Sequence, residues 1–141
     1  MQPIFSIGII YTDAHLVEIA VLVSNGRYSG GTAIYVSSEE LVELGRKILN
    51  FPKNLSDVVE EHFGEPESYS YLNFRFRCTD NLGHVGVEVT MYDNWDNAVS
   101  KDTRSRLYVL LPIEPSGLDE FAKGLVLMGE TKQGSVVMKV V

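Results

Sequence analysis

The side chains best suited to catalysis or metal binding lie far apart in this sequence. The three histidines, His15, His62 and His84, occupy separate segments, and none belongs to an i, i+4 pair or a Cys/His cluster of the kind that binds zinc. Cys78 falls on the apolar side of an alternating segment, which favours an inert core thiol over a nucleophile. No G-x-S-x-G elbow is present. The sequence thus predicts no metal, no cofactor and no catalytic residue, and it does not favour an enzyme.

A tryptophan and a tyrosine lie together in one polar segment, which contains Tyr92, Asp93, Trp95 and Asp96. Tyrosine and tryptophan anchor many protein interfaces, and acidic neighbours steer a basic partner toward the surface. The segment therefore predicts a partner-binding loop. The alternative, in which Trp95 folds back and covers the core, stays open.

Acidic side chains concentrate between residues 39 and 67, where Glu39, Glu43, Glu60 and Glu61 are expected on helices. Such a run is either a solvated helix face or a patch that a basic protein could bind. We take the patch, with the loop above, as the candidate partner-binding surface.

A rival interpretation uses Asp80, His84, Arg75 and Arg77 as the polar groups of a pocket between sheet and helix, in a small ligand-binding domain or an enzyme. The same arginines, with Tyr71 and Tyr92, resemble a stacking platform for single-stranded nucleic acid in residue type. The formal charge of −7 argues against nucleic acid.

Alternating apolar residues predict strands that must position these groups. In the first half of the chain we expect strands at 4–10, 16–23 and 28–36, with a type I′ turn at Asn25-Gly26 and a bulge or close approach at Gly30-Gly31. In the second half we expect a hairpin of Tyr71–Cys78 with Val85–Tyr92, followed by strands at 106–113 and 136–141. In the later hairpin we expect Phe76 opposite Val87, which places Arg75 across from Glu88.

Three helices are expected. Ser37 with Glu40 fits a capping box for a helix that buries Leu41, Leu44 and Ile48 and stops at Pro52. A second short helix is predicted from Asn54 or Ser56 through Phe63, ending at Gly64, and a third begins at Ser116, buries Leu118, Phe121 and Leu125 and closes at Gly129.

The composition indicates the structural class of the protein. The chain has 141 residues, 45% of them hydrophobic and 22% charged, which is typical of a globular protein and excludes collagen, coiled coil and wholesale disorder. No basic leader precedes the first apolar run and no stretch is long enough to cross a membrane, so we expect a cytoplasmic protein. We predict a single domain over residues 1–141, without internal repeats. Its class is α+β, with about seven mainly antiparallel strands in a sandwich-like or partly curled sheet, in the order βββ-αα-βββ-α-β.

The order of three features resembles small bacterial proteins near the WapI-type immunity proteins of polymorphic toxin systems. These features are Ser38-Glu39-Glu40-Leu41 leading to Phe51-Pro52, then 72–77, then Asp80 followed by Gly83-His84-Val85. The resemblance implies a cytoplasmic, non-enzymatic inhibitor that binds a basic toxin domain one to one. A third hypothesis is a self-associating structural protein that forms a homodimer through an exposed edge such as 136–141.

Overall fold

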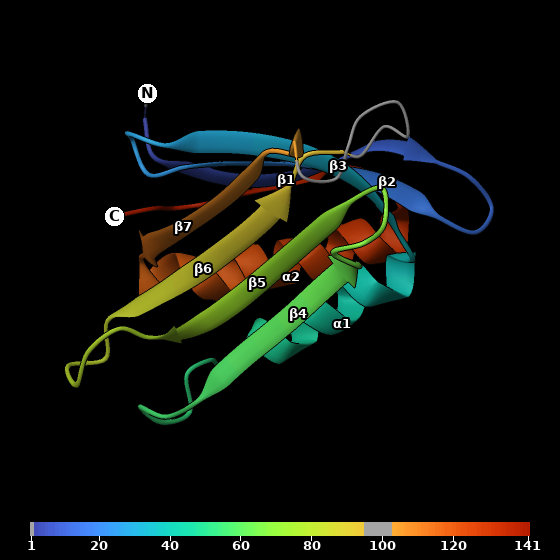
Figure 1. Ribbon diagram of the computed structural model, residues 1–141. Helices are drawn as coiled ribbons and strands as arrows, with labels where there is room; N and C mark the ends of the chain where they lie inside the picture. Colours follow the sequence, from blue (N-terminus) through green and yellow to red (C-terminus); the bar gives the residue numbers. More distant parts are fainter. Residues whose placement is uncertain (1, 95–102) are drawn as a thin grey trace.

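The computed structural model describes residues 2–94 and 103–141, and it has two four-stranded antiparallel sheets and two helices (Figure 1). The sheets have the strand orders β3-β2-β1-β8 and β4-β5-β6-β7. The elements are β1 (Ile4–Thr12), β2 (Val17–Ser24), β3 (Ser29–Val36), α1 (Ser38–Ile48), β4 (Val58–Gly64), β5 (Tyr71–Cys78), β6 (Val85–Tyr92), β7 (Arg106–Ile113), α2 (Pro115–Thr131) and β8 (Ser135–Met138). The predicted α+β class with antiparallel sheets is confirmed. The strands and helices differ from the prediction in number and order, and neither sheet closes on itself.

The chain contains the same arrangement of elements twice, which the sequence analysis did not predict. Three meandering strands and a helix, β1-β2-β3-α1, are followed by β4, and β5-β6-β7-α2 are followed by β8. The fourth strand of each half leaves its own sheet. It pairs antiparallel with the first strand of the other half, β4 with β5 and β8 with β1. The fold is therefore a βββαβ unit in two copies that exchange their last strands.

The prediction of a second helix that begins at Asn54 or Ser56 and runs through Phe63 is wrong, because Val58–Gly64 is strand β4. It pairs residue by residue with β5, from Val58 opposite Arg77 to Gly64 opposite Tyr71. The residues before it form a turn, in which the Asn54 side chain accepts hydrogen bonds from the N–H and hydroxyl of Ser56. Gly64 has the expected positive φ of 69°, but it ends a strand and not a helix.

The core lies between the inward faces of the two sheets and the helices. The Phe5 ring of β1 lies 5.2 Å from the Phe74 ring of β5 and 5.3 Å from the Phe121 ring of α2, so one side chain joins both sheets to a helix. The helix residues predicted to be buried are all buried: Leu41, Leu44, Ile48, Leu118, Phe121 and Leu125. No helix in the described part of the chain is long and apolar enough to cross a membrane.

The helices pack closely and antiparallel. The predicted capping box is confirmed, since Ser37 and Glu40 exchange side-chain and backbone hydrogen bonds. A Cβ on Gly45 would lie 2.6 Å from the carbonyl oxygen of Ala122, so the absence of a side chain there permits the approach. Gly129 does not end α2 as predicted, because it lies inside the helix against Ser38, and Lys132 caps the helix at a φ of 56°.

Two turn predictions also need correction. The β2–β3 connection is a four-residue loop, in which the Asn25 side chain accepts from the N–H groups of Arg27 and Tyr28, and only Gly26 of the Asn-Gly pair has a positive φ. The register of β2 with β3 runs unbroken through Gly30 and Gly31, so no bulge lies there. Gly30 instead allows a close approach, since a Cβ would meet a methyl carbon of Leu107 at 2.8 Å.

Candidate functional site

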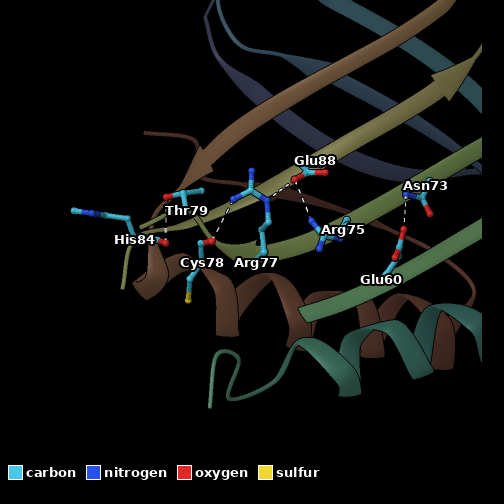
Figure 2. A network of polar contacts seen from close by, with 8 residues as sticks. All are labelled: Glu60, Asn73, Arg75, Arg77, Cys78, Thr79, His84 and Glu88. Atoms are coloured by element: carbon cyan, nitrogen blue, oxygen red, sulfur yellow. Dashed lines mark hydrogen bonds and ion pairs between the residues drawn. The ribbon is translucent and has the colours of Figure 1, made fainter. Parts of the chain in front are cut away.

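The outward side of the β4-β5-β6-β7 sheet carries a group of long polar side chains. In β5, Leu72, Phe74 and Phe76 point into the core while the residues between them point outward. Arg75 and Arg77 therefore lie on the side of the sheet away from the core and helices (Figure 2). This position rules out their predicted place in a pocket between sheet and helix.

Glu88 links the two arginines. The expected register is confirmed, with Phe76 opposite Val87 and Arg75 opposite Glu88. One oxygen of Glu88, Oε1, accepts hydrogen bonds from Arg75 Nη1 at 3.2 Å and from Arg77 Nε (Figure 2). The Arg77 hydrogen bond, aided by both positive charges and by the Tyr108 hydroxyl, holds the pKa of Glu88 below its ordinary value. The Glu88 side chain is only 17% exposed, so it lies beneath the two more exposed arginines and holds both guanidinium groups in place.

An aromatic cluster extends this surface toward the other end of the sheet. The rings of Tyr71 and Tyr92 lie 5.0 Å apart, and the Arg106 guanidinium lies 4.9 Å from the centre of the Tyr92 ring. Arg104 lies on the same ring at 5.4 Å, and it donates to the carbonyl oxygens of Asp93, Pro66 and Tyr69. Burial raises the pKa of Tyr71. Tyr92, predicted as a partner contact, thus belongs to a braced cluster.

Asp80 and His84 lie together at the tip of the β5–β6 hairpin. The Asp80 carboxylate accepts from the N–H groups of Leu82 and His84, and its Oδ2 lies 2.5 Å from His84 Nδ1. The His84 hydrogen bond lowers the pKa of Asp80. Both side chains are largely exposed, and neither lines any of the surface hollows described below. Their geometry shapes the turn.

The predicted acidic surface is divided between two sides of the molecule. Glu60 and Glu61 lie on a strand, where Glu60 accepts from the Asn73 side chain on the outward face and Glu61 forms a 2.7 Å ion pair with Lys47 of α1. The hydrogen bond between Lys47 and Glu61 raises the pKa of Lys47. Glu39 and Glu43 line a hollow of about 420 Å³ between the helices, which also contains Arg46. Asp93 follows β6, whereas Trp95 and Asp96 lie outside the described residues.

The remaining titratable candidates also lie apart. His15 follows Asp13 in the β1–β2 turn, and His62 lies 3.6 Å from Glu65. The Cys78 side chain is half-buried and points toward the helices in Figure 2, away from the Arg77 guanidinium. Within residues 2–94 and 103–141, no group of three or more His, Cys, Asp and Glu side chains could hold a metal ion.

Arg106 and Tyr108 were not among the predicted site residues, although their strand was predicted. Tyr108 is 61% exposed on the outward side of β7. The alternation in β7 places Val109, Leu111 and Ile113 inward, and this pattern would have placed Arg106 and Tyr108 together on the opposite face.

The fold and surface define an α+β protein of two strand-exchanged βββαβ halves, with an aromatic and arginine-rich face on the second sheet. No family model, no curated protein and no solved structure matches the chain. The resemblance to immunity proteins therefore stays a prediction.

Proposed function

We propose that this protein is a non-enzymatic protein-binding module whose partner binds the outward side of the β4-β5-β6-β7 sheet. The single observation that carries the proposal is the gathering of three tyrosines and three arginines on neighbouring strands. We call this surface the aromatic–arginine face; its members are Tyr71, Arg75, Arg77, Tyr92, Arg106 and Tyr108.

These residue types suit a protein interface. Tyrosine and arginine are enriched among the side chains that supply most of the binding free energy. The tyrosine ring buries a large area with few rotatable bonds, and the arginine guanidinium stacks on aromatic rings and donates several hydrogen bonds. Glu88 holds two of the arginines, and the Tyr92 ring stacks against Arg106. Since these side chains are already positioned, a partner orders few of them on binding.

The charge of the face favours an acidic segment on the partner. Three arginines outnumber the two carboxylates on this surface, Glu88 and Glu60, on a chain with a formal charge of −7. The guanidinium groups of Arg75 and Arg77 keep N–H donors for a partner's carboxylates. A protein suits this small excess of charge better than a nucleic acid, whose binding depends on many phosphate contacts.

The competing hypothesis, an inhibitor of a basic toxin domain, would use the helix surface at Glu39 and Glu43. One capture experiment separates the two. The chain and its variants are immobilised and cross-linked to partners in a lysate of the cells that produce it. The test variants are Arg106→Ala/Tyr108→Ala and Glu39→Lys/Glu43→Lys, and the control is Leu82→Ala, because Leu82 is 83% exposed in the β5–β6 turn and lies outside both surfaces.

We expect the partner recovered by the wild type to fall about tenfold or more with Arg106→Ala/Tyr108→Ala, and to persist with the other two variants. That partner should carry an acidic contact region. Loss of a basic partner with Glu39→Lys/Glu43→Lys alone would overturn the proposed face and favour the inhibitor. Failure of the wild type to capture any partner would count against both.

A further inference from the structure

The outward side of the β3-β2-β1-β8 sheet differs from the aromatic–arginine face in having no charge over most of its area. Three successive rows of outward residues contain only Ile, Leu, Val, Ala, Gly and Ser: Ile4 and Ser29; Val137, Ser6, Leu22 and Gly31; and Ser135, Gly8, Ala20 and Ala33. On the paired strands the next row carries Glu18 between Tyr11 and Tyr35, and at the β8 edge the charged Lys139 follows Val137. We call these three rows the uncharged face.

The uncharged face exposes large apolar side chains beside a hollow. Val137 is 64% exposed and Leu22 is 41% exposed. Next to them, Gly8, Ala20 and Ala33 leave a hollow of about 640 Å³ along the sheet. A contiguous apolar surface of this kind on a protein marks an interaction site.

We propose that the uncharged face binds a second copy of this chain, so that the protein forms a symmetric dimer through its first sheet. The net charge of the chain favours a second copy as the occupant of this face. Two copies with a formal charge of −7 each repel one another, and contact through a charged surface would bring like carboxylates together. The uncharged face allows two such chains to meet without opposing charges. A basic partner would gain nothing there, because the face has no carboxylate to attract it.

The shape of the face is self-complementary. Leu22 and Val137 project on either side of Ser6, and the adjacent row of Gly8, Ala20 and Ser135 has only small side chains. A two-fold axis between these rows places Leu22 and Val137 of each copy over the small side chains of the other, as an isologous interface requires.

The available area predicts the strength of association. Three rows about 6.7 Å apart on four strands about 4.8 Å apart give a footprint of about 380 Å² per copy, or about 770 Å² in total. This total lies below the roughly 1,200 Å² that stable specific interfaces bury. We therefore expect a weak, reversible dimer with a Kd of about 100 µM or more and not an obligate one.

Sedimentation equilibrium of the full chain from about 10 to 500 µM tests the proposal. The wild-type mass should rise from the monomer value of 15.7 kDa toward twice that value. Leu22→Glu should stay monomeric, with a Kd about 100-fold weaker or more, because the symmetry buries one unpaired carboxylate from each copy. The matched control is Leu110→Glu, since Leu110 is 37% exposed on the outward side of the other sheet; it should dimerise like the wild type.

Circular dichroism checks that each variant is folded, and Val137→Glu replaces Leu22→Glu if the latter unfolds. A wild type that remains at 15.7 kDa up to 500 µM would overturn the proposal. So would a folded Leu22→Glu protein that dimerises normally, or a folded Leu110→Glu protein that does not dimerise, because the contact would then lie on another face.

Discussion

The two βββαβ halves share their inward residues in chemical type but not their outward ones. In the helices, Leu41, Leu44 and Ile48 of α1 occupy the places of Leu118, Phe121 and Leu125 in α2, counted from the first helical residue. In the sheets, matched rows differ completely on the outside. The row Ser135, Gly8, Ala20 and Ala33 corresponds to Glu60, Arg75, Glu88 and Leu110.

This difference separates what the fold requires from what a surface can vary. A buried position must be apolar in both halves, because an unpaired polar group there costs several kcal/mol. An outward position carries no such constraint, so one sheet could acquire ion pairs and tyrosines while the other stayed small and uncharged. The same backbone thus offers two chemically different faces.

The largest expected loss of stability tests whether the two halves share one core. It concerns a matched pair of core residues, Ile7 of β1 and Phe74 of β5. Both are fully buried. We expect Phe74→Ala to lower the free energy of unfolding by about 4 kcal/mol and Ile7→Ala by about 3 kcal/mol, because each leaves a cavity. Urea unfolding measures both. A cost below about 1 kcal/mol for either would mean that the halves do not share one core.

The next largest loss of stability is expected where the two helices cross, at the matched residues Gly45 and Ala122. A Cβ on Gly45 would lie 2.7 Å from Val126 Cγ2 as well as 2.6 Å from the Ala122 carbonyl oxygen, so the helices must move apart. We expect Gly45→Ala to destabilise the protein by about 2 kcal/mol, although alanine favours helices, and Ala122→Gly by about 1 kcal/mol. Thermal unfolding distinguishes them; stabilisation by Gly45→Ala would show that the crossing tolerates a methyl group.

Glu88 and its counterpart Ala20 provide a pH-dependent test. The folded-state pKa of Glu88 is lowered by the Arg77 hydrogen bond, so its stabilisation is present above the unfolded pKa and is lost as the pH falls through the folded pKa. We expect Glu88→Gln to cost about 1 to 2 kcal/mol at pH 7 and far less near pH 2. Ala20→Gln, on the uncharged face, should change stability little at either pH. Equal costs for Glu88→Gln at both pH values would contradict the ion-pair role.

The smallest effects concern the matched turn residues Asp13 and Asp80, each of which follows a threonine. The pKa of Asp13 is lowered by hydrogen bonds from the N–H groups of His15 and Leu16, and that of Asp80 first by the His84 ring. Each aspartate therefore stabilises the fold above its unfolded pKa and loses this effect as the pH falls. Asp13→Ala and Asp80→Ala should each lower the Tm slightly at pH 7 and not at pH 2.5. His84→Ala should lower it by less than Asp80→Ala, because the backbone hydrogen bonds remain.

Much of the fold follows from local patterns in the sequence. The capping box of Ser37 and Glu40 and the alternation in Tyr71–Cys78 predict α1, β5 and the register of Arg75 with Glu88. β4 could not be predicted, because Val58 and Val59 are adjacent apolar residues that fit a helix as well as a strand, and only pairing with β5 decides between them.

The duplication and part of the site could not be predicted from local patterns either. Outward residues differ between the halves, so only apolar class and the Thr-Asp pairs at 12–13 and 79–80 recur along the sequence. Arg75, Arg77 and Tyr92 could be chosen as candidates by type. Their shared surface with Arg106 and Tyr108 depends on the order of three strands, which the sequence alone does not specify.

The exchanged strands also determine when the protein can fold during its synthesis. Phe5 of β1 pairs with Met138 of β8, so the first sheet has an open edge until nearly all of this sequence has left the ribosome. Contacts between such distant segments slow folding, because the intervening loop must close first. A nascent first half therefore presents a bare β1 edge, and this edge is where a chaperone would protect the growing chain from aggregation.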